Sequence, residues 1–467
     1  YKVIASCESP SQGIMRGEVV NNQSVLNTLK PLLVELETRI GEPILEVEVG
    51  IAGRYIRCKS VSSNINRPDP NEVISEQEIN NMWRNMYNSR VDPGEEVLHV
   101  VPQSYHVDDY RSVPDPVGMY GSCIEANYKL FIGKSVSAEH TKRTIEGTEL
   151  NLNRLALEPL ATARAVLQED EKELGVAMVD IGGGTTDLLV YQDNIIRHTA
   201  VIPFGGNVIT EDIRQGCEVT VRQAEQMKIQ YGSCYADLAP ENKAIVIAGI
   251  GGRESREIPF RFLANIIEAR MDEILDAVMY EINQSGYGNR LPAGIVLTGG
   301  GSLLFNLPQF IKFKTGYDAR VARPHGIITE GCEEVNQVTY SCAAGLLMYG
   351  FENQGHFPEE KQADLTGKGS VGESINGKRN LLAFFKFADV LFRHSETQFQ
   401  RICLDYLKNR HAVADKITGG KPLFFDRPVK RRINFRPRQP FPGDGQCSLH
   451  PFEFRFGKRG PGGDIVK

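Results

Sequence analysis

Residues 179–187 read Val-Asp-Ile-Gly-Gly-Gly-Thr-Thr-Asp and constrain the fold of this chain more than any other segment. An apolar run, residues 175–179, leads into Asp180, and a second run, residues 188–191, follows Asp187. Two runs of strand length separated by glycines predict a β-hairpin rather than a strand that enters a helix. Glycine permits positive φ and lets backbone N–H groups approach an anion closely. The two threonine hydroxyls and the flanking carboxylates favour a phosphate-binding turn over an ordinary tight turn, and Asp180 can hold a metal ion or orient a water.

A second strand ends in glycines at residues 295–302, which read Ile-Val-Leu-Thr-Gly-Gly-Gly-Ser. Ligands of α/β folds bind beyond the carboxyl ends of strands, where a glycine loop lets a flat adenosine approach the backbone. Neither glycine segment contains a Walker A sequence or the pattern G-x-G-x-x-G, so a P-loop and a Rossmann dinucleotide site are excluded. Together the two segments suggest a nucleotide site.

The composition narrows the class of protein. A chain of 467 residues is long enough for two to four domains, and 41% hydrophobic with 24% charged residues is ordinary for a globular protein. The formal net charge of −6 argues against nucleic-acid binding. The nine cysteines occur without a C-x-x-C pair, which favours reduced thiols over disulfides or a zinc site. No apolar run reaches the roughly 18 residues of a transmembrane helix. The chain begins at Tyr1 rather than at methionine, so we expect further structure upstream.

The hydrophobic pattern predicts the main elements. Strands are predicted at residues 1–5, 17–20, 45–51, 96–102, 124–132 and 244–248, and helices at residues 25–40, 138–146 and 338–350. The alternating strand at 45–51 is expected to be half-buried. Ser75 with Glu78 three residues later is a capping-box pattern that predicts the start of a helix. The Arg-Pro-Asp-Pro sequence at 67–70 is a candidate domain boundary.

Several segments resemble the actin-like ATPase superfamily and, within it, the FtsA family of bacterial cell-division proteins. They are residues 98–103, 115–119, 155–161, 173–187 and 198–207, and the first two lie in a subdomain specific to that family. The resemblance covers roughly residues 1–350. It implies an α/β architecture of two lobes, the actin-like or ribonuclease H-like ATPase fold, with an FtsA-type inserted subdomain.

The same resemblance divides the chain into lobes and flanking segments. The expected units are a first-lobe core at 1–70 and 151–174, an inserted subdomain at 71–150, a second-lobe core at 175–206 and 291–351, a helical subdomain at 207–290, a flexible linker at 352–379, a possible membrane-contact segment at 380–392 and a basic, disordered tail at 393–467.

The resemblance also implies the residues of an ATP–Mg²⁺ site. Phosphate contacts are expected from Gly182, Gly183, Gly184, Thr185 and Thr186, cleft contacts from Gly205, Gly206 and Asn207, and adenosine contacts from Glu225, Lys228, Gly299, Gly300, Gly301 and Ser302. Asp180 would face the metal, through a water, or the hydrolytic water, and Glu158 would lie near that water.

From the sequence alone, purely structural interpretations stay open for four of these sites, and the glycine loop at residues 298–302 is by itself a weak indication of a nucleotide site. Glu225 and Lys228, at i and i+3 on one helical face, could be a surface pair. Glu158 before a proline could end a strand, and the Gly205-Gly206 pair could be a turn. A sugar- or acetate-type kinase or an Hsp-type chaperone ATPase of the same superfamily is the alternative class of protein.

The chain departs from the family pattern at both ends. The family's first phosphate loop, an Asp-x-Gly-Thr hairpin, has no counterpart before Ser60, so we expect this chain to bind ATP weakly or not at all. Residues 380–392 place Leu381, Leu382, Phe385, Ala388 and Phe392 on one helical face, which predicts an amphipathic segment for membrane contact or for packing on the tail. The tail, residues 393–467, holds 16 Lys and Arg against 7 Asp and Glu, and its basic stretch at 427–438 would attract anionic lipid.

By resemblance, ATP acts as an assembly switch and the chain is at most a weak ATPase. The implied role is to tether FtsZ to the cytoplasmic face of the bacterial inner membrane at the division septum. The C-terminal tail of FtsZ would dock on residues 207–290, where Arg253, Arg256 and Arg261 are candidate contacts for an acidic peptide. Self-association into filaments and recruitment of other divisome proteins through residues 71–150 are also implied.

Overall fold

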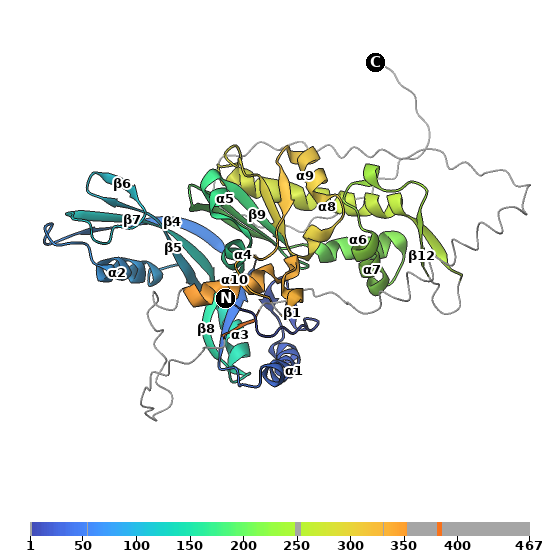
Figure 1. The fold of residues 1–467 in the computed structure, drawn as a ribbon, viewed down its shortest axis with the longest axis horizontal. Coiled ribbons are helices and arrows are strands. Elements are labelled where there is room, and N and C mark those ends of the chain that lie inside the picture. The colour runs from blue at the N-terminus through green and yellow to red at the C-terminus, as the bar shows by residue number, and fades with distance from the viewer. Residues whose placement is uncertain (1, 54, 248–253, 330, 353–380, 385–467) are drawn as a thin grey trace, which may run out of the picture. The chain divides into compact units, whose positions relative to one another are not determined.

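The computed structural model describes residues 2–53, 55–247, 254–329, 331–352 and 381–384 (Figure 1). The predicted linker after Glu352, most of the predicted membrane-contact segment, the basic tail and Arg253 therefore lie outside the described residues. Within them, the chain forms a mixed α/β fold with one mixed five-stranded sheet, one parallel three-stranded sheet and a separate antiparallel four-stranded sheet. Its α-helices are α1 (Asn22–Ile40), α2 (Glu76–Tyr87), α3 (Ser135–Glu146), α4 (Glu158–Val166), α5 (Glu169–Leu174), α6 (Gly206–Cys217), α7 (Val221–Tyr231), α8 (Phe260–Gln284), α9 (Leu307–Thr315) and α10 (Ser341–Glu352).

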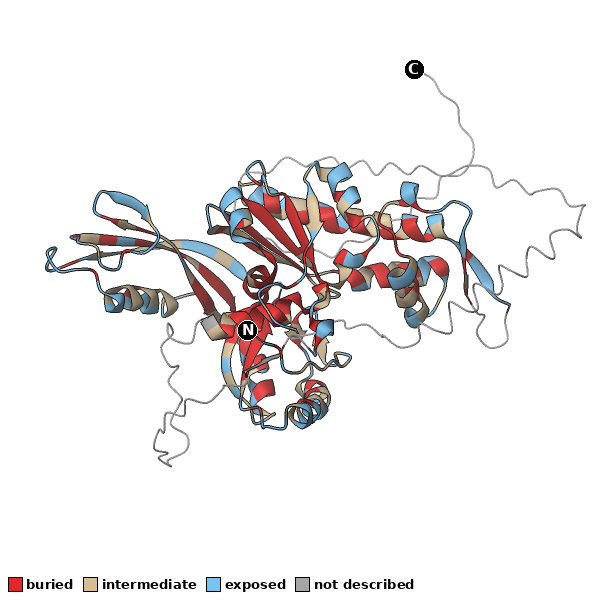
Figure 2. Ribbon diagram, in the orientation of Figure 1, coloured by how far each residue is buried: buried red, intermediate tan, exposed pale blue. Residues whose placement is uncertain are grey.

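The second lobe is built on a five-stranded sheet of order β11-β10-β9-β14-β15. Its strands are β9 (Val176–Ile181), β10 (Thr186–Gln192), β11 (Ile195–Ile202), β14 (Ile295–Thr298) and β15 (Ala319–Val321). The first three run antiparallel, which confirms the predicted hairpin, while β14 lies parallel to both β9 and β15. Apolar side chains of β9, β10 and β14 are buried (Figure 2), because helices cover the sheet.

The first lobe has a smaller sheet of order β16-β3-β8, and both pairings are parallel. Its strands are β3 (Glu46–Ile51), β8 (Asn151–Leu157) and β16 (Leu381–Phe384). The expectation that the strand near 45–51 is half-buried is wrong, because Val47 to Ile51 are all buried between flanking elements. The strand expected at residues 1–5 reduces, among the described residues, to one bridge between Lys2 and Ile328.

Strand β16 corrects the prediction of a helix over residues 380–392. Residues 381–384 pair in register with Glu46 to Val49 of β3, and β16 also lies beside α10. Residues 385–392 lie outside the described residues. Periodicity alone misassigned the segment, because an apolar run can satisfy either a helix or a sheet edge, and the open edge of β3 offers backbone partners.

The inserted subdomain is a four-stranded antiparallel sheet of order β4-β7-β5-β6 with α2 packed against it. Its strands are β4 (Arg57–Asn66), β5 (Glu95–Val107), β6 (Tyr110–Val113) and β7 (Cys123–Lys134). Ser75 and Glu78 form the predicted capping box of α2. The boundary predicted at residue 71 cuts this sheet, since β4 precedes it. Arg67, expected at a boundary, is buried and binds the Glu78 carboxylate at 2.8 Å and three backbone carbonyls.

Helix α3 also lies elsewhere than expected. Its Ala138 and Ile145 pack in one apolar core with Val47 and Val49 of β3, so α3 belongs to the first lobe rather than to the insertion.

The remaining described elements are short. The short strands are β1 (Ile14–Met15), β2 (Glu18–Val19), β12 (Ala244–Ile247) and β13 (Arg256–Pro259), and the 3₁₀ turns are η1 (Ala236–Leu238), η3 (Gly300–Leu303), η4 (Glu333–Val335) and η5 (Val338–Tyr340). One core joins the second-lobe sheet to α6, α7 and α8, so the helical subdomain is continuous with that lobe.

Candidate functional site

The predicted phosphate turn connects β9 to β10. The Gly182 N–H donates to the Thr185 carbonyl at 3.0 Å, which closes the turn. The first two amides of α6, those of Gly206 and Asn207, donate to the carbonyls of Gly182 and Gly183 at 2.8 and 2.9 Å. The turn and the N-terminus of α6 are therefore held together as one unit. The three glycines of the turn do not have positive φ, so their use here is to leave the turn without side chains.

A cavity of about 170 Å³ opens over this turn. Of the residues expected from the sequence, it is lined by Glu158, Asp180, Gly182, Gly183, Gly184, Thr185, Gly206, Asn207, Glu225, Lys228, Gly299, Gly300 and Gly301. The fold thus gathers two glycine loops and two groups of charged side chains that lie far apart in the sequence.

Thr186, Gly205 and Ser302, for which ligand contacts are also expected, are not among the residues that line the cavity. The Thr186 hydroxyl donates to the Phe204 carbonyl at 2.9 Å, and the Ser302 hydroxyl donates to the Gly299 carbonyl at 2.7 Å. A Cβ on Gly205 would lie 2.4 Å from the Gly182 carbonyl oxygen, so only glycine lets α6 approach the turn this closely. All three residues support the backbone behind the cavity.

The second glycine loop touches the end of β9. Gly299 has φ +78°, and a Cβ there would lie 2.2 Å from Asp180 Oδ1 and 2.6 Å from the Ile181 carbonyl oxygen. Glycine is therefore required at this position by both conformation and space. Thr298, just before it, is fully buried and its hydroxyl shares a hydrogen bond with the Ser341 hydroxyl at 2.6 Å. These contacts fix the loop against the carboxylate.

Three carboxyl groups face one another at the cavity floor. Burial raises the pKa of Asp180 to about 6, against the opposing hydrogen bond from the Thr162 hydroxyl at 3.2 Å. Asp187 lies opposite Asp180 in the hairpin register, and burial together with Glu158 and Asp180 raises its pKa well above the usual value. Asp187 Oδ1 has no hydrogen-bond partner among the described residues, which suits a water or a cation. Within the described residues, no group of three or more His, Cys, Asp or Glu side chains could hold a metal ion.

Glu225 and Lys228 are not a surface pair. They form an ion pair at 2.8 Å on α7 with side chains only 20% and 12% exposed. The Lys228 ammonium also donates to the Gly206 carbonyl at 3.0 Å and to the Thr210 hydroxyl at 2.8 Å. Glu158 does not end a strand but is the first residue of α4, and it is buried.

Sequence reasoning missed several residues at this site. Asp187 flanks the glycine turn, and its place opposite Asp180 follows from the predicted hairpin, so the signal was present. Gly50 of β3 lies under Glu158, since a Cβ there would approach the Glu158 Cγ to 2.8 Å, and a lone glycine in a strand gives only a weak signal. Cys342 of α10 lines the cavity beside Glu158 and no pattern in the sequence points to it.

Comparison with known proteins places the chain in a family. The model described as "Cell division protein FtsA" matches residues 177–345, and that described as "SHS2 domain inserted in FTSA" matches residues 53–132. The cell division protein FtsA of Pseudomonas aeruginosa is 34% identical over 354 residues, which are 76% of this chain and 84% of that protein. Those of Neisseria meningitidis serogroup B and Escherichia coli K12 are each 32% identical, over 76% and 80% of this chain and 86% and 89% of those proteins. The chain belongs to the FtsA family.

A solved structure bears out the fold. The chain resembles a structure titled "PilM-PilN type IV pilus biogenesis complex" with a TM-score of 0.50 and 17% identity, over 74% of this chain and 90% of that one. At this identity the likeness concerns the fold alone. It agrees with the expected actin-like architecture, and the match at 53–132 agrees with an FtsA-type inserted subdomain that begins before residue 71.

Membership of the FtsA family assigns the chain a role in cell division. It decides against the kinase and chaperone alternatives, which belong to other families of the superfamily. Among the helices of the described residues, none combines the length and the apolar character needed to cross a membrane.

Proposed function

We propose that this FtsA-family chain binds ATP with Mg²⁺ in the cavity above the phosphate turn. The observation that carries the proposal is the convergence, in one cavity of about 170 Å³, of both glycine loops with Glu225, Lys228 and the buried carboxyl groups. A turn of glycines leaves its backbone N–H groups open to phosphate oxygens. A glycine loop at the end of a strand lets a flat base approach the backbone. Nucleotide binding also fits the actin-like fold.

Each group of residues then has a part in binding. The turn at Gly182 to Thr185 would face the phosphates, Gly299 to Gly301 would border the adenosine, and Glu225 with Lys228 would reach the ribose and base. Asp180 would hold Mg²⁺ through a water, and the buried Asp187 oxygen without a partner suits the same cation shell. Bound Mg²⁺ would neutralise phosphate charge.

Hydrolysis, in this proposal, is slow and serves assembly. Glu158 would orient a water from the first-lobe side of the cavity, since it is buried there as the first residue of α4. Burial raises the pKa of Asp180 and, together with the neighbouring carboxyl groups, that of Asp187, so the ionised form of each group is disfavoured. ATP would act chiefly by its different affinity for two arrangements of the lobes.

At the cellular level, we propose that the chain self-associates and tethers FtsZ to the cytoplasmic face of the membrane at the septum. The FtsZ tail would dock on residues 207–290. Arg256 and Arg261 there are exposed but already pair with Glu218 and with Asp237 and Glu241, so an acidic peptide must compete with these carboxylates. Other divisome proteins would bind the inserted subdomain. Any membrane contact would involve residues after β16.

The nucleotide proposal is tested by calorimetric titration of the full chain with Mg²⁺–ATP. Glu225→Ala removes the Lys228 partner and a lining carboxylate, and we expect about tenfold weaker binding, the loss of one charged contact. Lys312→Ala, which removes an exposed ion pair on α9, is the matched control and should leave affinity unchanged. Equal affinity in all three proteins would contradict the site. A nanomolar to low-micromolar affinity would contradict the expectation of weak binding.

The cellular proposal has a separate test. FtsZ and the full chain are mixed with anionic vesicles and sedimented. FtsZ should move to the vesicle fraction only when the chain is present, and Arg261→Glu should reduce this transfer. FtsZ remaining in the supernatant would count against the tethering role.

A further inference from the structure

A buried histidine connects the inserted subdomain to the strand that leads into the cavity. His99 lies on β5 of the insertion and is only 3% exposed. With its proton on Nδ1, His99 accepts at Nε2 from the Leu157 N–H at 3.1 Å; with its proton on Nε2, the same nitrogen donates to the Leu155 carbonyl at 3.1 Å. Leu157 is the last residue of β8 in the first lobe. One side chain of the insertion therefore holds the end of a first-lobe strand.

The histidine ring is suited to accept this hydrogen bond. Burial, assisted by the nearby Arg154 guanidinium, lowers the pKa of His99 to about 4, so the ring is neutral at physiological pH and one nitrogen keeps its lone pair. Tyr349 of α10 meets the ring edge to face, with centroids 5.9 Å apart. The ring is thus fixed from two sides while it accepts from the backbone.

The residue after Leu157 is Glu158, the carboxylate that the first lobe contributes to the cavity. Leu157 is the N-cap of α4 and has no side chain that could cap the helix, so the backbone at this point depends on neighbouring groups. The Glu158 side chain packs over Gly50, where a Cβ would approach Glu158 Oε1 to 2.9 Å. A small shift of the Leu157 backbone would therefore move the Glu158 carboxyl relative to Asp180 and Asp187.

We propose that His99 is a positioning residue that couples the inserted subdomain to Glu158 in the nucleotide cavity. The inference rests on the proposed nucleotide function. A displacement of β5, such as binding of another protein to the insertion would produce, breaks the bond to Leu157 and releases the start of α4. In the reverse direction, a ligand that draws Glu158 toward the phosphates changes the position of β5, because coupling between two sites is reciprocal.

The test compares four variants of the full chain for Mg²⁺–ATP affinity. His99→Leu removes the acceptor and should weaken binding by about fivefold to tenfold. His99→Gln keeps an oxygen that can accept from Leu157 and should restore affinity to within about twofold. In a Glu158→Gln background, His99→Leu should have no further effect. Fully additive effects of the two substitutions, or failure of His99→Gln to restore binding, would overturn the proposal.

A second measurement does not depend on nucleotide. Hydrogen exchange at residues 157–162 should accelerate in His99→Leu and stay slow in His99→Gln. His106→Leu, further along β5, is the matched control and should leave these amides unchanged. Unchanged exchange in His99→Leu overturns the positioning role. If the wild-type chain binds no ATP, the nucleotide proposal fails, and this exchange measurement alone decides whether His99 holds the start of α4.

Discussion

The two lobes have the same kind of parallel strand pair but complete it differently. In the second lobe, β9 pairs with the free edge of β14, whose other edge pairs with β15. The end of β9 carries Asp180 and leads into the glycine turn. In the first lobe, β16 pairs with the free edge of β3, whose other edge pairs with β8. The pairing of β16 with β3 is parallel, like that of β9 with β14. The sequence after β16 begins Phe-Lys-Phe-Ala, with neither a glycine nor a hydroxyl. The corresponding strand ends in the glycine turn in the second lobe, and in the first lobe it pairs with β3.

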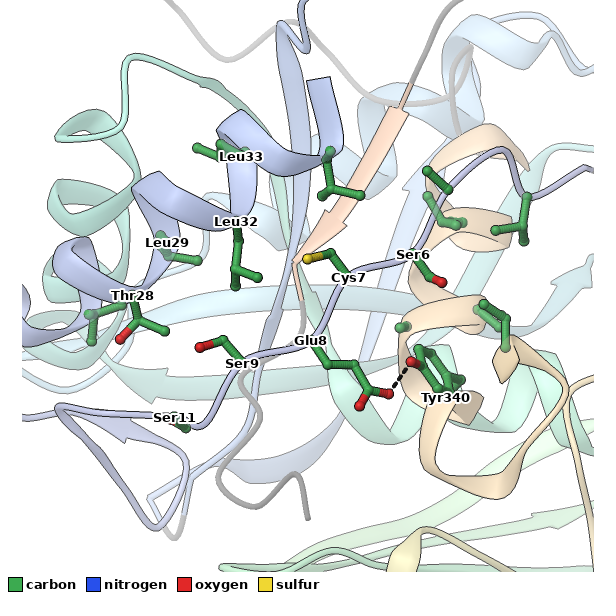
Figure 3. A pocket seen from close by; sticks show the side chains of 18 of the residues that line it. Ser6, Cys7, Glu8, Ser9, Ser11, Thr28, Leu29, Leu32, Leu33 and Tyr340 are labelled. Atoms are coloured by element: carbon green, nitrogen blue, oxygen red, sulfur yellow. Dashed lines mark hydrogen bonds between the residues drawn. The ribbon is translucent and has the colours of Figure 1, made fainter. Parts of the chain in front are cut away.

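Packing differs between the lobes as well. The core beneath the second-lobe sheet leaves a void of only about 10 Å³. In the first lobe, an apolar cavity of about 170 Å³ lies between leucines of α1, the segment from Val3 to Gln12, and α10. Figure 3 shows Leu29, Leu32 and Leu33 on one side and Tyr340, bonded to Glu8, on the other. The second lobe therefore supports both glycine loops on a closely packed core, whereas the first lobe contributes chiefly Glu158 to the cavity.

The largest expected effect tests this close packing at Gly299. Gly299→Ala places a Cβ against Asp180 and forces a positive φ, so we expect a loss of about 3 kcal/mol or more in unfolding free energy and no measurable ATP binding. Gly316→Ala is the matched control, because Gly316 has φ +80° with no atom near its Cβ position. It should cost only about 1 kcal/mol in denaturant unfolding. Equal losses in the two variants would show that the loop is not closely packed.

A second prediction concerns the charge buried at the end of β9. The folded pKa of Asp180 is about 6 against 3.8 for the free group, so the carboxyl destabilises the fold as pH rises through about 6 and does so least below about 4. Asp180→Asn removes this dependence. Its unfolding free energy relative to wild type should rise by up to about 3 kcal/mol between about pH 4 and pH 7. A difference that stays constant with pH would contradict the burial of this charge.

A third prediction tests the strand that completes the first lobe. Leu382→Pro removes a backbone N–H from β16, so alternate amides of β3 should exchange faster and unfolding should cost about 1 to 2 kcal/mol less. Leu382→Val keeps the N–H and a residue suited to strands, and should behave as wild type. If exchange in β3 is the same in both variants, residues 381–384 do not complete this sheet in solution.

The smallest effects separate residues that line the cavity from those behind it. Thr186→Val removes a buried hydrogen bond to Phe204 and should cost about 1 kcal/mol of stability with little change in ATP affinity. Thr185→Val acts on a lining hydroxyl and should weaken ATP binding several-fold with little change in stability. Thermal unfolding and titration on both variants measure the two effects. The reverse pattern would move Thr186 into the ligand contacts.

Local signals in the sequence predicted elements of the second lobe and of the inserted subdomain. The apolar runs around the glycines specify the β9–β10 hairpin, and Ser75 with Glu78 specify the start of α2, because both depend on residues close in sequence. The i, i+3 spacing correctly placed Glu225 and Lys228 on one face of α7. Such features are predictable since the physical cause lies within one turn or one helix.

Contacts between distant segments could not be predicted in the same way. Nothing near Leu381 in the sequence indicates that it pairs with Glu46. For this reason residues 381–384 were predicted as part of a helix, whereas the structure shows the strand β16. Gly50 lies against Glu158, and His99 contacts the preceding residue, Leu157, although both lie far from them in the chain. Thr186 and Ser302 carry hydroxyls that suit phosphates, yet only the fold shows that backbone carbonyls use them.

The pairing of β16 with β3 also affects how other strands compete for this sheet edge. Because both strands belong to one polypeptide, pairing is unimolecular, with an effective concentration on the order of millimolar. A strand offered by a separate molecule must exceed that concentration or bind more tightly before it displaces β16.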